Sequence, residues 1–399
     1  MPDLVAPLLR PAAPDGPTGS AGPVRVVAPP RPAAAVGHGK THGPVAFYVH
    51  HHGAGHANRA KLLAARWPAE RVHVFTSAAE RFVGWSGGRV HALPPDVAPG
   101  RDPQKDLLQN RVLHYAPVGL PSLSERMAKI AAWIADARPS LFIVDLSVEV
   151  ALFARLCGAR TALVRLHGHR DDPAHTAAFG LCDRLVAPFP EALDDPHTPD
   201  AVRRMTVYLG AFSRYDGRTL TRAEARRQID YAPAPDRRLA VVINGSGGAD
   251  RDPDVWCDIA GANPSWDWLL VGRVPVCDDP PANLHHAGYQ KDTFPFLRAA
   301  DVVVGSGGTN TMMEVGAART RFVSLPEPRP FDEQLCKMQA LSRLGLTEVC
   351  ETRPAPDAWA PVLDAALRQD PSGWDRLFAE DALASGVAEL QTPVHATSA

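Results

Sequence analysis

Four histidines and two glycines occupy a short segment that follows the first apolar run of the sequence. The segment is His50–His56, and the apolar run begins at Val45. Imidazole titrates near neutral pH, so a histidine on a loop after a strand can take a proton from a substrate hydroxyl. Metal binding is the alternative. His52 and His56 lie on a glycine loop rather than on a helix face, and no cysteine or acid is spaced to complete a zinc site, so we expect no metal.

Two further glycine-rich turns follow apolar runs in the second half of the chain. Asn244–Gly248 follows Leu239–Ile243, and Gly305–Gly308 follows Asp301–Val304. Glycine lacks a Cβ, so backbone amides in such turns can approach a phosphate, and a helix that starts there adds partial positive charge. A tight turn without a ligand is the alternative for either turn alone, but two such turns in one domain favour a phosphate site.

A carboxylate lies about one and a half turns into the helix that we expect to begin near Thr309. This residue, Glu314, could accept both hydroxyls of a ribose whose phosphates lie at the helix start. The polar triplet Asp332–Gln334 comes at the next strand–helix turn and should face the same cleft. An exposed helix carboxylate without a ligand is the alternative for Glu314.

These residues resemble a motif of the GT-B glycosyltransferases. The similarity is to the lipid-linked GlcNAc transferase of peptidoglycan synthesis and to the plant and antibiotic nucleotide-sugar glycosyltransferases. Their pattern is Gly-x-Asn-(Ser/Thr)-x-x-Glu, then an apolar strand and Pro, then Asp/Glu-x-Gln or Asp/Glu-Gln. This chain matches the pattern at Asn310, Thr311, Glu314, Pro326, Asp332 and Gln334.

The resemblance implies donor-binding roles for the matching residues. Glu314 would hold the ribose, and Gln334, with Asp332 or Glu333, would read hydroxyls of the donor sugar. The nucleotide base would lie near Tyr289. Ser306 stands where plant members usually have histidine. The remaining donor-side residues, which would lie at the diphosphate or in the same motif, are Ser246, Gly247, Ser306, Gly307, Gly308 and Asn310.

The resemblance also implies a catalytic pair in the N-terminal half. Family members often carry Gly-His just before the first helix, and His56 matches that histidine. Plant members orient it with an aspartate at a later strand end, and Asp145 holds such a place. A carboxylate on the far ring nitrogen would fix the tautomer and stabilise the cation. The alternatives are that His56 only positions a substrate or is a solvated loop residue, and that Asp145 is a helix N-cap.

The residues expected on the acceptor side come from two loops. Gly53 and Gly55 belong to the histidine-rich loop. His167 and His169 follow the apolar run Ala162–Leu166 and should face the cleft. Each of these histidines could bind the acceptor or act as an alternative base. The alternative is a solvated loop histidine without a functional role.

Apolar runs alternate with helical patterns along most of the chain, which predicts an α/β fold. We expect two Rossmann-like, doubly wound parallel-sheet domains that face a cleft, the GT-B arrangement. The predicted strands are 45–50, 72–75, 141–145, 162–166, 239–243, 268–271, 301–304 and 321–325, and the main predicted helices are 57–67, 123–134, 148–157 and 332–344. The predicted parts are a disordered Pro/Ala-rich tail (1–43), an N-terminal acceptor-binding domain (44–211), a linker (212–237), a C-terminal nucleotide-sugar-binding domain (238–385) and a flexible tail (386–399).

Composition excludes several protein classes. A net charge of −2 over 399 residues does not attract nucleic acid. The six cysteines are far apart without a CxxC pair, so we expect reduced thiols that mostly fill the core. The sequence has no run of 18 apolar residues and no recognisable signal peptide. We therefore expect a cytoplasmic protein with at most peripheral membrane contact.

Together these patterns predict an inverting, metal-independent glycosyltransferase of the hexosyltransferase type. The resemblance implies a nucleotide-diphosphate sugar as the donor, with UDP expected and dTDP or GDP left open. It is a substrate, so no cofactor is expected. The acceptor could be a small molecule, a lipid-linked sugar or a polymer. The alternatives are a sugar-nucleotide 2-epimerase of the same fold and a non-catalytic nucleotide-sugar-binding protein. An oxidoreductase is disfavoured because the G-x-G-x-x-G fingerprint is absent after Ile243.

Overall fold

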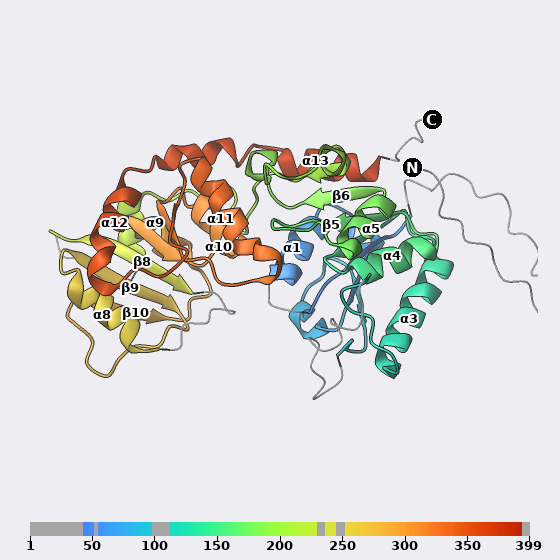
Figure 1. Ribbon diagram of the computed structural model, residues 1–399, viewed down its shortest axis with the longest axis horizontal. Coiled ribbons are helices and arrows are strands. Elements are labelled where there is room, and N and C mark those ends of the chain that lie inside the picture. The colour runs from blue at the N-terminus through green and yellow to red at the C-terminus, as the bar shows by residue number, and fades with distance from the viewer. Residues whose placement is uncertain (1–42, 52–54, 98–111, 230–235, 245–251, 393–399) are drawn as a thin grey trace, which may run out of the picture. The chain divides into compact units, whose positions relative to one another are not determined.

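A computed structural model describes residues 43–51, 55–97, 112–229, 236–244 and 252–392 (Figure 1). The predicted tail up to residue 42 lies outside the described residues. The same holds for Gly53, Ser246, Gly247 and residues 393–399.

Seven parallel strands form the first sheet, in the order β3-β2-β1-β4-β5-β6-β7. Alternate residues of one strand pack on opposite faces: Val45 and Phe47 enter one core, and Ala46 and Tyr48 enter the other. Both faces are therefore buried, as the continuous apolar runs require. The strands are β1 (Val45–Tyr48), β2 (Val72–Thr76), β3 (Arg89–Ala92), β4 (Leu141–Asp145), β5 (Thr161–Val164), β6 (Arg184–Ala187) and β7 (Thr206–Tyr208).

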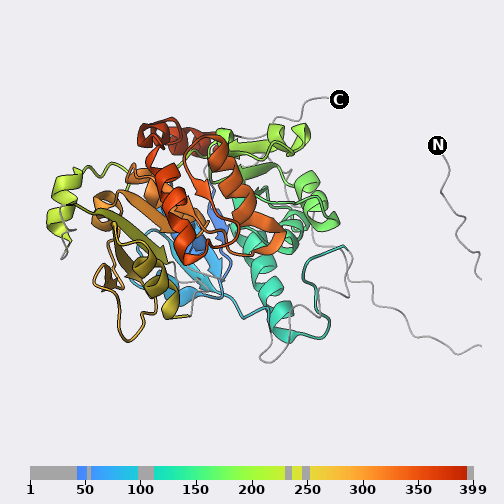
Figure 2. The ribbon, with the colours of Figure 1, turned by 60° about the vertical axis from the view of Figure 1, so that its left-hand side comes forward.

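Helices cover both faces of this sheet (Figures 1 and 2). Two of them begin at side-chain caps. The Ser147 hydroxyl accepts a hydrogen bond from the Val150 amide, and the Asp172 carboxylate accepts from the amides of Ala174 and His175. The helices are α1 (Gly55–Ala64), α3 (Pro121–Ala137), α4 (Val148–Leu156), α5 (Pro173–Leu181) and α6 (Asp200–Met205), with 3₁₀ turns η1 (Ala69–Arg71), η2 (Ala79–Phe82) and η3 (Glu191–Leu193).

Six parallel strands form the second sheet, in the order β10-β9-β8-β11-β12-β13. Its strands are β8 (Arg238–Asn244), β9 (Trp266–Gly272), β10 (Leu284–Gly288), β11 (Val302–Gly305), β12 (Phe322–Ser324) and β13 (Glu348–Val349). The helices that follow β7 are α7 (Arg222–Gln228), α8 (Asp254–Ala262), α9 (Phe294–Ala299), α10 (Thr309–Ala317), α11 (Glu333–Arg343), α12 (Trp359–Leu367) and α13 (Ala382–Gln391), with η4 (Pro330–Asp332), η5 (Pro356–Ala358) and η6 (Pro371–Arg376).

Each sheet has one topological switch point, where ligands of doubly wound folds bind. In the first sheet it lies between β1 and β4, so the loop before α1 and the end of β4 meet there. In the second sheet it lies between β8 and β11, so the turn Gly305–Gly308 borders it. The fold-class prediction of two doubly wound lobes is confirmed, and all eight predicted strands are found.

The last helix was missed by the sequence prediction of a flexible tail from residue 386. Residues 386–391 are the second half of α13, which runs over the first lobe (Figure 1). Val387 and Leu390 are buried in the same core as β1 and β7. A Cβ on Gly386 would lie 2.7 Å from the Leu209 side chain, so this helix packs tightly against the chain after β7. The prediction is wrong for this part because an apolar helical stripe was overlooked.

The predicted linker is only partly a connection. Its helix α7 begins at a capping box in which Thr221 and Glu224 cap each other's backbone. Ala225 and Ile229 are buried in a core of the second lobe together with Phe294 of α9. This part of the segment is therefore packed with the second lobe.

The expectation of reduced thiols throughout is wrong for two cysteines. Cys257 of α8 and Cys277 form a disulfide, with Cα atoms 6.4 Å apart. Their separation of 20 residues matches no short cysteine motif. They meet because α8 follows β8 and the Cys277 loop follows the neighbouring strand β9. The other four cysteines, Cys157, Cys182, Cys336 and Cys350, are free.

In the part of the chain that the structure describes, no helix combines the length and hydropathy needed to cross a membrane.

Candidate active site

The structure brings His56 and Asp145 together at the switch point of the first sheet. The His56 Nδ1 lies 3.1 Å from an Asp145 carboxylate oxygen, and both side chains are largely shielded, with 17% and 7% of their surface exposed. Helix α1 begins at Gly55, so His56 lies in its first turn rather than in the loop before it. This start holds the ring against the end of β4.

A third residue that the sequence analysis missed completes this group. Arg59 Nη2 donates to both oxygens of Asp145, at 2.7 and 2.9 Å, and lies 3.0 Å from His56 Nδ1. Arg59 follows His56 by three residues on α1, so the two side chains share a helix face. That spacing is the signal that could have identified it.

Arg59 controls the charge of Asp145. Burial alone would raise the pKa of this carboxyl group, but the neighbouring Arg59 and His56 outweigh burial and hold the pKa well below its usual range. Asp145 is therefore an anion at neutral pH.

The two partners of His56 Nδ1, Arg59 and Asp145, require different protonation states of this nitrogen. Arginine only donates, so a bond from Arg59 needs an unprotonated Nδ1, whereas a bond to Asp145 needs a proton on it. Only one can form at a time. A base that acts through Nε2 needs the second arrangement, in which Asp145 stabilises the imidazolium.

The start of α10 at the switch point of the second sheet is open. Gly308 is its N-cap, and no side chain of the described residues caps this end. A Cβ on Gly308 would meet nothing closer than 3.7 Å, and Ser306 is partly exposed beside it. The amides of this first turn are thus accessible to an anion.

The neighbouring Gly307 has a different role from the one expected. A Cβ there would lie 2.9 Å from Met338 and 3.0 Å from the Gln334 side chain, both on α11. Gly307 is buried against that helix. The glycine is required for packing of the turn on α11, so the expected opening for a phosphate lies at Gly308 instead.

Glu314 carries an ion pair in this structure. Arg214 Nε donates to one of its oxygens at 2.9 Å, and Thr293 Oγ1 donates to the other at 3.1 Å. Arg214 is partly exposed and stacks on Tyr215. A ligand that uses Glu314 must therefore replace Arg214 on the carboxylate.

Glu314, Arg214 and Arg59 line one pocket of about 230 Å³. Asn310 lines it from α10, and its amide nitrogen would lie 3.9 Å from a Cβ on Gly55 of α1. The pocket therefore lies between α1 and the N-terminal end of α10, one helix from each lobe.

The triplet after β12 is split between burial and exposure. Gln334 is buried, and its side-chain oxygen accepts from the Glu327 amide at 2.9 Å. Glu333 pairs with Lys337 of the same helix at 3.1 Å. Asp332 is exposed, with φ 55°, in the left-handed region. The Gln334 side chain therefore already has a hydrogen-bond partner within the protein, whereas we expected it to bind hydroxyls of the donor sugar.

A buried lysine that the sequence analysis missed underlies the turn before α10. Lys337 Nζ donates to Thr309 Oγ1 at 2.7 Å and to the Gly307 carbonyl at 3.2 Å. Burial lowers the pKa of Lys337, and the nearby Glu333 opposes that shift. Its spacing of four from Glu333 on α11 is typical of a helix ion pair. The turn thus has a fixed cation beneath it.

The two predicted acceptor-side histidines differ. His167 is only 3% exposed, its Nε2 lies 2.9 Å from the Leu193 carbonyl, and its ring packs on Phe189. The expectation that it faces the cleft is wrong, because the chain after β5 turns this ring into the core. His169 is exposed, and its amide donates to the Phe331 carbonyl of the other lobe at 2.9 Å.

Tyr289, expected near the nucleotide base, is 73% exposed at the end of β10. Gly288 before it has φ 67°, a left-handed conformation that favours glycine. The ring is therefore available to a ligand.

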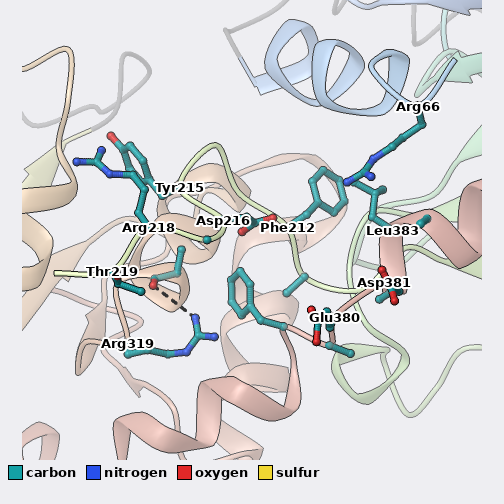
Figure 3. Close-up of a pocket in the computed structure, with 17 residues that line it drawn as sticks. Arg66, Phe212, Tyr215, Asp216, Arg218, Thr219, Arg319, Glu380, Asp381 and Leu383 are labelled. Carbon is teal, nitrogen blue, oxygen red and sulfur yellow. Dashed lines mark hydrogen bonds between the residues drawn. The ribbon is translucent and has the colours of Figure 1, made fainter. Parts of the chain in front are cut away.

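A second pocket, of about 510 Å³, contains none of the predicted site residues (Figure 3). It lies where residues 211–219 and 378–384 pass each other, with Arg66 and Arg319 at its wall. Burial raises the pKa of Asp216 there. Its volume is greater, but Glu314, Arg59 and the start of α10 line the smaller pocket, which we take as the candidate site.

Comparison with known proteins gives one weak sequence relative. No protein-family model matches the chain. A UDP-N-acetylglucosamine--N-acetylmuramyl-(pentapeptide) pyrophosphoryl-undecaprenol N-acetylglucosamine transferase of Streptococcus equi subsp. equi (strain 4047) is 23% identical over 199 residues. The match covers 47% of this chain and 54% of the relative, so the chain spans about half the length of the curated relative that it matches.

Solved structures are similar over most of the chain. The glycotransferase of kitacinnamycin is 17% identical, with a TM-score of 0.60 over 88% of this chain and 96% of that chain. MurG of Acinetobacter baumannii is 14% identical, with a TM-score of 0.58 over 87% and 99%. The spinosyn forosaminyltransferase SpnP is 15% identical, with a TM-score of 0.58 over 88% and 94%. The chain has the two-lobed GT-B fold of these glycosyltransferases.

Proposed function

We propose that the protein is an inverting glycosyltransferase. It would move a hexosyl group from a nucleotide-diphosphate sugar, with UDP as the expected nucleotide, to a hydroxyl of an acceptor. One observation carries the proposal: a single pocket joins the Arg59 face of α1, which holds His56 and Asp145, to the open start of α10 with Glu314.

The donor binds at the second lobe in this proposal. Its diphosphate lies at the first turn of α10, where free amides and the helix dipole favour an anion. Lys337 adds a fixed positive charge beneath the same turn. Glu314 then accepts the ribose hydroxyls after Arg214 leaves its carboxylate.

The acceptor binds at the first lobe and reacts at the sugar. Its hydroxyl oxygen attacks the anomeric carbon on the face opposite the diphosphate. The bond from that carbon to the diphosphate oxygen breaks, and the electron pair leaves with the diphosphate. The hydroxyl proton passes to His56, whose charged form is stabilised by Asp145. The amides of α10 stabilise the leaving group, so the reaction needs no metal.

A 2-epimerase of the same fold is the second candidate. It needs acids and bases around the sugar ring and no acceptor. The observation against it is that Glu333 and Gln334, beside the expected sugar position, are already paired with Lys337 and Glu327.

Calorimetric titration with UDP, dTDP and GDP without added metal tests the donor site. We expect one nucleotide diphosphate to bind best. Glu314→Gln should weaken that binding by about 10- to 100-fold, because a charged hydrogen bond contributes about 1.5–3 kcal/mol.

Glu389→Gln is the matched control, since Glu389 is exposed on α13. It should bind like the parent. Equal affinity in Glu314→Gln and Glu389→Gln would remove the ribose assignment. Binding to none of the three nucleotides would leave a GT-B scaffold without a donor.

A cytoplasmic location belongs to the same proposal. In the cytoplasm, reducing conditions would act on the Cys257–Cys277 disulfide. Labelling of accessible thiols inside cells tests the location, because Cys257 and Cys277 take up the label only where they are reduced.

A further inference from the structure

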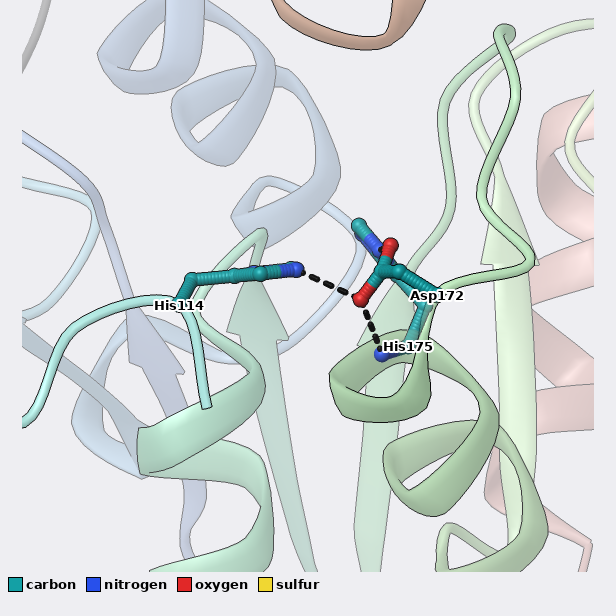
Figure 4. A group of neighbouring side chains, drawn as sticks. All are labelled: His114, Asp172 and His175. Carbon is teal, nitrogen blue, oxygen red and sulfur yellow. Dashed lines mark hydrogen bonds and ion pairs between the residues drawn. The ribbon is translucent and has the colours of Figure 1, made fainter. Parts of the chain in front are cut away.

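A second histidine–aspartate group lies outside the pair already described (Figure 4). His114 Nε2 is 2.8 Å from an Asp172 oxygen, and His175 Nδ1 bonds the other oxygen of the same carboxylate. The loop before α3 supplies His114, and the first turn of α5 supplies His175. Two distant segments therefore meet on one carboxylate.

Arg170 fixes the direction of hydrogen bonding in this group. Its Nη1 lies 3.0 Å from His175 Nε2. Arginine only donates, so Nε2 must accept, and the single proton of neutral His175 must be on Nδ1. That proton is donated to Asp172. Burial lowers the pKa of His175 to about 4, which keeps the ring neutral at pH 7.

The same reasoning gives the direction of the hydrogen bond between Asp172 and His114. Asp172 remains ionised, because hydrogen bonds from His175 and His114 outweigh burial and lower its pKa. A carboxylate only accepts, so His114 donates through Nε2, and in the neutral ring Nδ1 then carries the lone pair. Among the described residues Nδ1 has no hydrogen-bond partner, and 28% of the side chain is exposed.

An aromatic ring of the other lobe lies beside the two histidines. The centroid of Phe331 is 5.4 Å from that of His114 and 4.8 Å from that of His175. Phe331 has φ 62° and is followed by Asp332 with φ 55°, both in the left-handed region that such residues rarely adopt. Its carbonyl is held by the His169 amide. The strained loop thus presents its ring to His114 just before the triplet at the start of α11.

A metal ion is the other ligand that these residues could attract. One atom from each of His114, Asp172 and His175 lies within 4.8 Å of the others. A metal on His175 Nδ1 would need the ring proton on Nε2, where it would oppose the Arg170 donor. The hydrogen-bond polarity therefore favours a proton-accepting nitrogen over a metal ligand.

We propose that His114 Nδ1 binds a hydroxyl of a hydroxylated ring in the acceptor, whose apolar face packs on Phe331. This inference rests on the proposed function, since it assigns the class of the acceptor. A sugar-like ring presents both groups at once, a hydroxyl donor at its edge and C–H groups on its face. His114 and Asp172 then select the acceptor, while His56 serves the reacting hydroxyl.

The first test is acylation of the full-length protein by diethylpyrocarbonate, which attacks unprotonated imidazole nitrogens, with each site followed by peptide mass spectrometry. His114 should react several-fold faster than exposed His197, and His175 should not react. Asp172→Asn should slow His114 to the rate of His197. Equal rates in the parent and in Asp172→Asn would overturn the polarised nitrogen. So would tight Zn²⁺ binding that blocks the reaction.

The second test uses the nucleotide sugar that the parent protein consumes and offers methyl hexopyranosides as acceptors. His114→Gln should leave nucleotide release to water within about twofold and lower transfer to the ring about tenfold, the loss of one hydrogen bond. Equal transfer by parent and variant overturns the assignment, and so does hydrolysis by the parent without transfer to any of these rings.

Failure of the proposed function gives a different result. The parent would then consume no nucleotide sugar at all, while the acylation rates would still report on His114.

Discussion

The two histidine–aspartate pairs of the first lobe differ in where their arginine lies. At the end of β4, Arg59 bonds the carboxylate itself and also reaches His56. At the start of α5, Arg170 is separated from Asp172 by His175. In the first pair, Asp145 bonds the guanidinium directly, and Arg59 and Asp145 compete for His56 Nδ1. In the second pair, Asp172 has no direct bond to Arg170, and the Arg170 donor fixes the tautomer of neutral His175.

The largest expected difference between the pairs concerns stability. Asp145→Asn leaves buried Arg59 without its anion, which should cost about 3–5 kcal/mol of unfolding free energy. Asp172→Asn removes a partly exposed anion and keeps a good N-cap, so it should cost about 1 kcal/mol or less. Urea unfolding of both variants measures the contrast. Similar losses of unfolding free energy in the two variants would show that the deeper burial of Asp145 does not make its pair more important for stability.

The pairs should also respond to acid in different pH ranges. The pKa of His175 is lowered to about 4, so the unfolded chain binds more protons between about pH 6.5 and 4. Stability from this group is full above about pH 6.5 and falls as pH drops to 4. The pKa of Asp145 is also depressed, so its stabilisation is full above about pH 4 and is lost only below that.

Unfolding free energies at a series of pH values check this separation. His175→Gln should flatten the curve between about pH 6.5 and 4 by up to about 1.4 kcal/mol per pH unit and leave the steeper region below pH 4. His197→Gln is the control, because His197 is exposed. An unchanged slope in His175→Gln would mean that folding does not lower the pKa of this ring.

A smaller effect is expected at the donor carboxylate. Arg214 competes for Glu314, so Arg214→Gln should tighten nucleotide diphosphate binding by a few-fold, a gain of about 1 kcal/mol from a partly exposed ion pair. Calorimetric titration measures this change in affinity. The control is Arg329→Gln, which removes the Arg329–Glu327 ion pair outside the pocket. Weaker binding in Arg214→Gln would instead make Arg214 a contact to the donor.

Periodicity and turn chemistry predicted the fold well where strands are buried on both faces. β1, β4 and β8 are continuous apolar runs, and all were found. The strands β3, β6, β7, β10 and β13 were missed. In β3, Arg89 and His91 give a polar pattern, and β7 has only three residues. Helix α13 was missed because its apolar stripe packs on a lobe that is distant in sequence.

The candidate site shows the same division. A motif and a strand end predicted that His56 and Asp145 would lie close together, and they do. The spacing of three residues on α1 could have identified Arg59, but the sequence could not show that Arg214 pairs with Glu314. That contact depends on side-chain packing between segments far apart in the chain. His114 and Asp172, 58 residues apart, have no motif at all.

The most direct test of glycosyl transfer is nucleotide diphosphate release from the best-binding nucleotide sugar, measured for the parent, His56→Ala and the control His197→Ala. The account predicts that His56→Ala binds the donor like the parent and releases nucleotide about 10²- to 10⁴-fold more slowly, the usual contribution of a general base. His197→Ala should match the parent. Unchanged release in His56→Ala, with the donor fully bound, would contradict the central claim that this histidine accepts the proton.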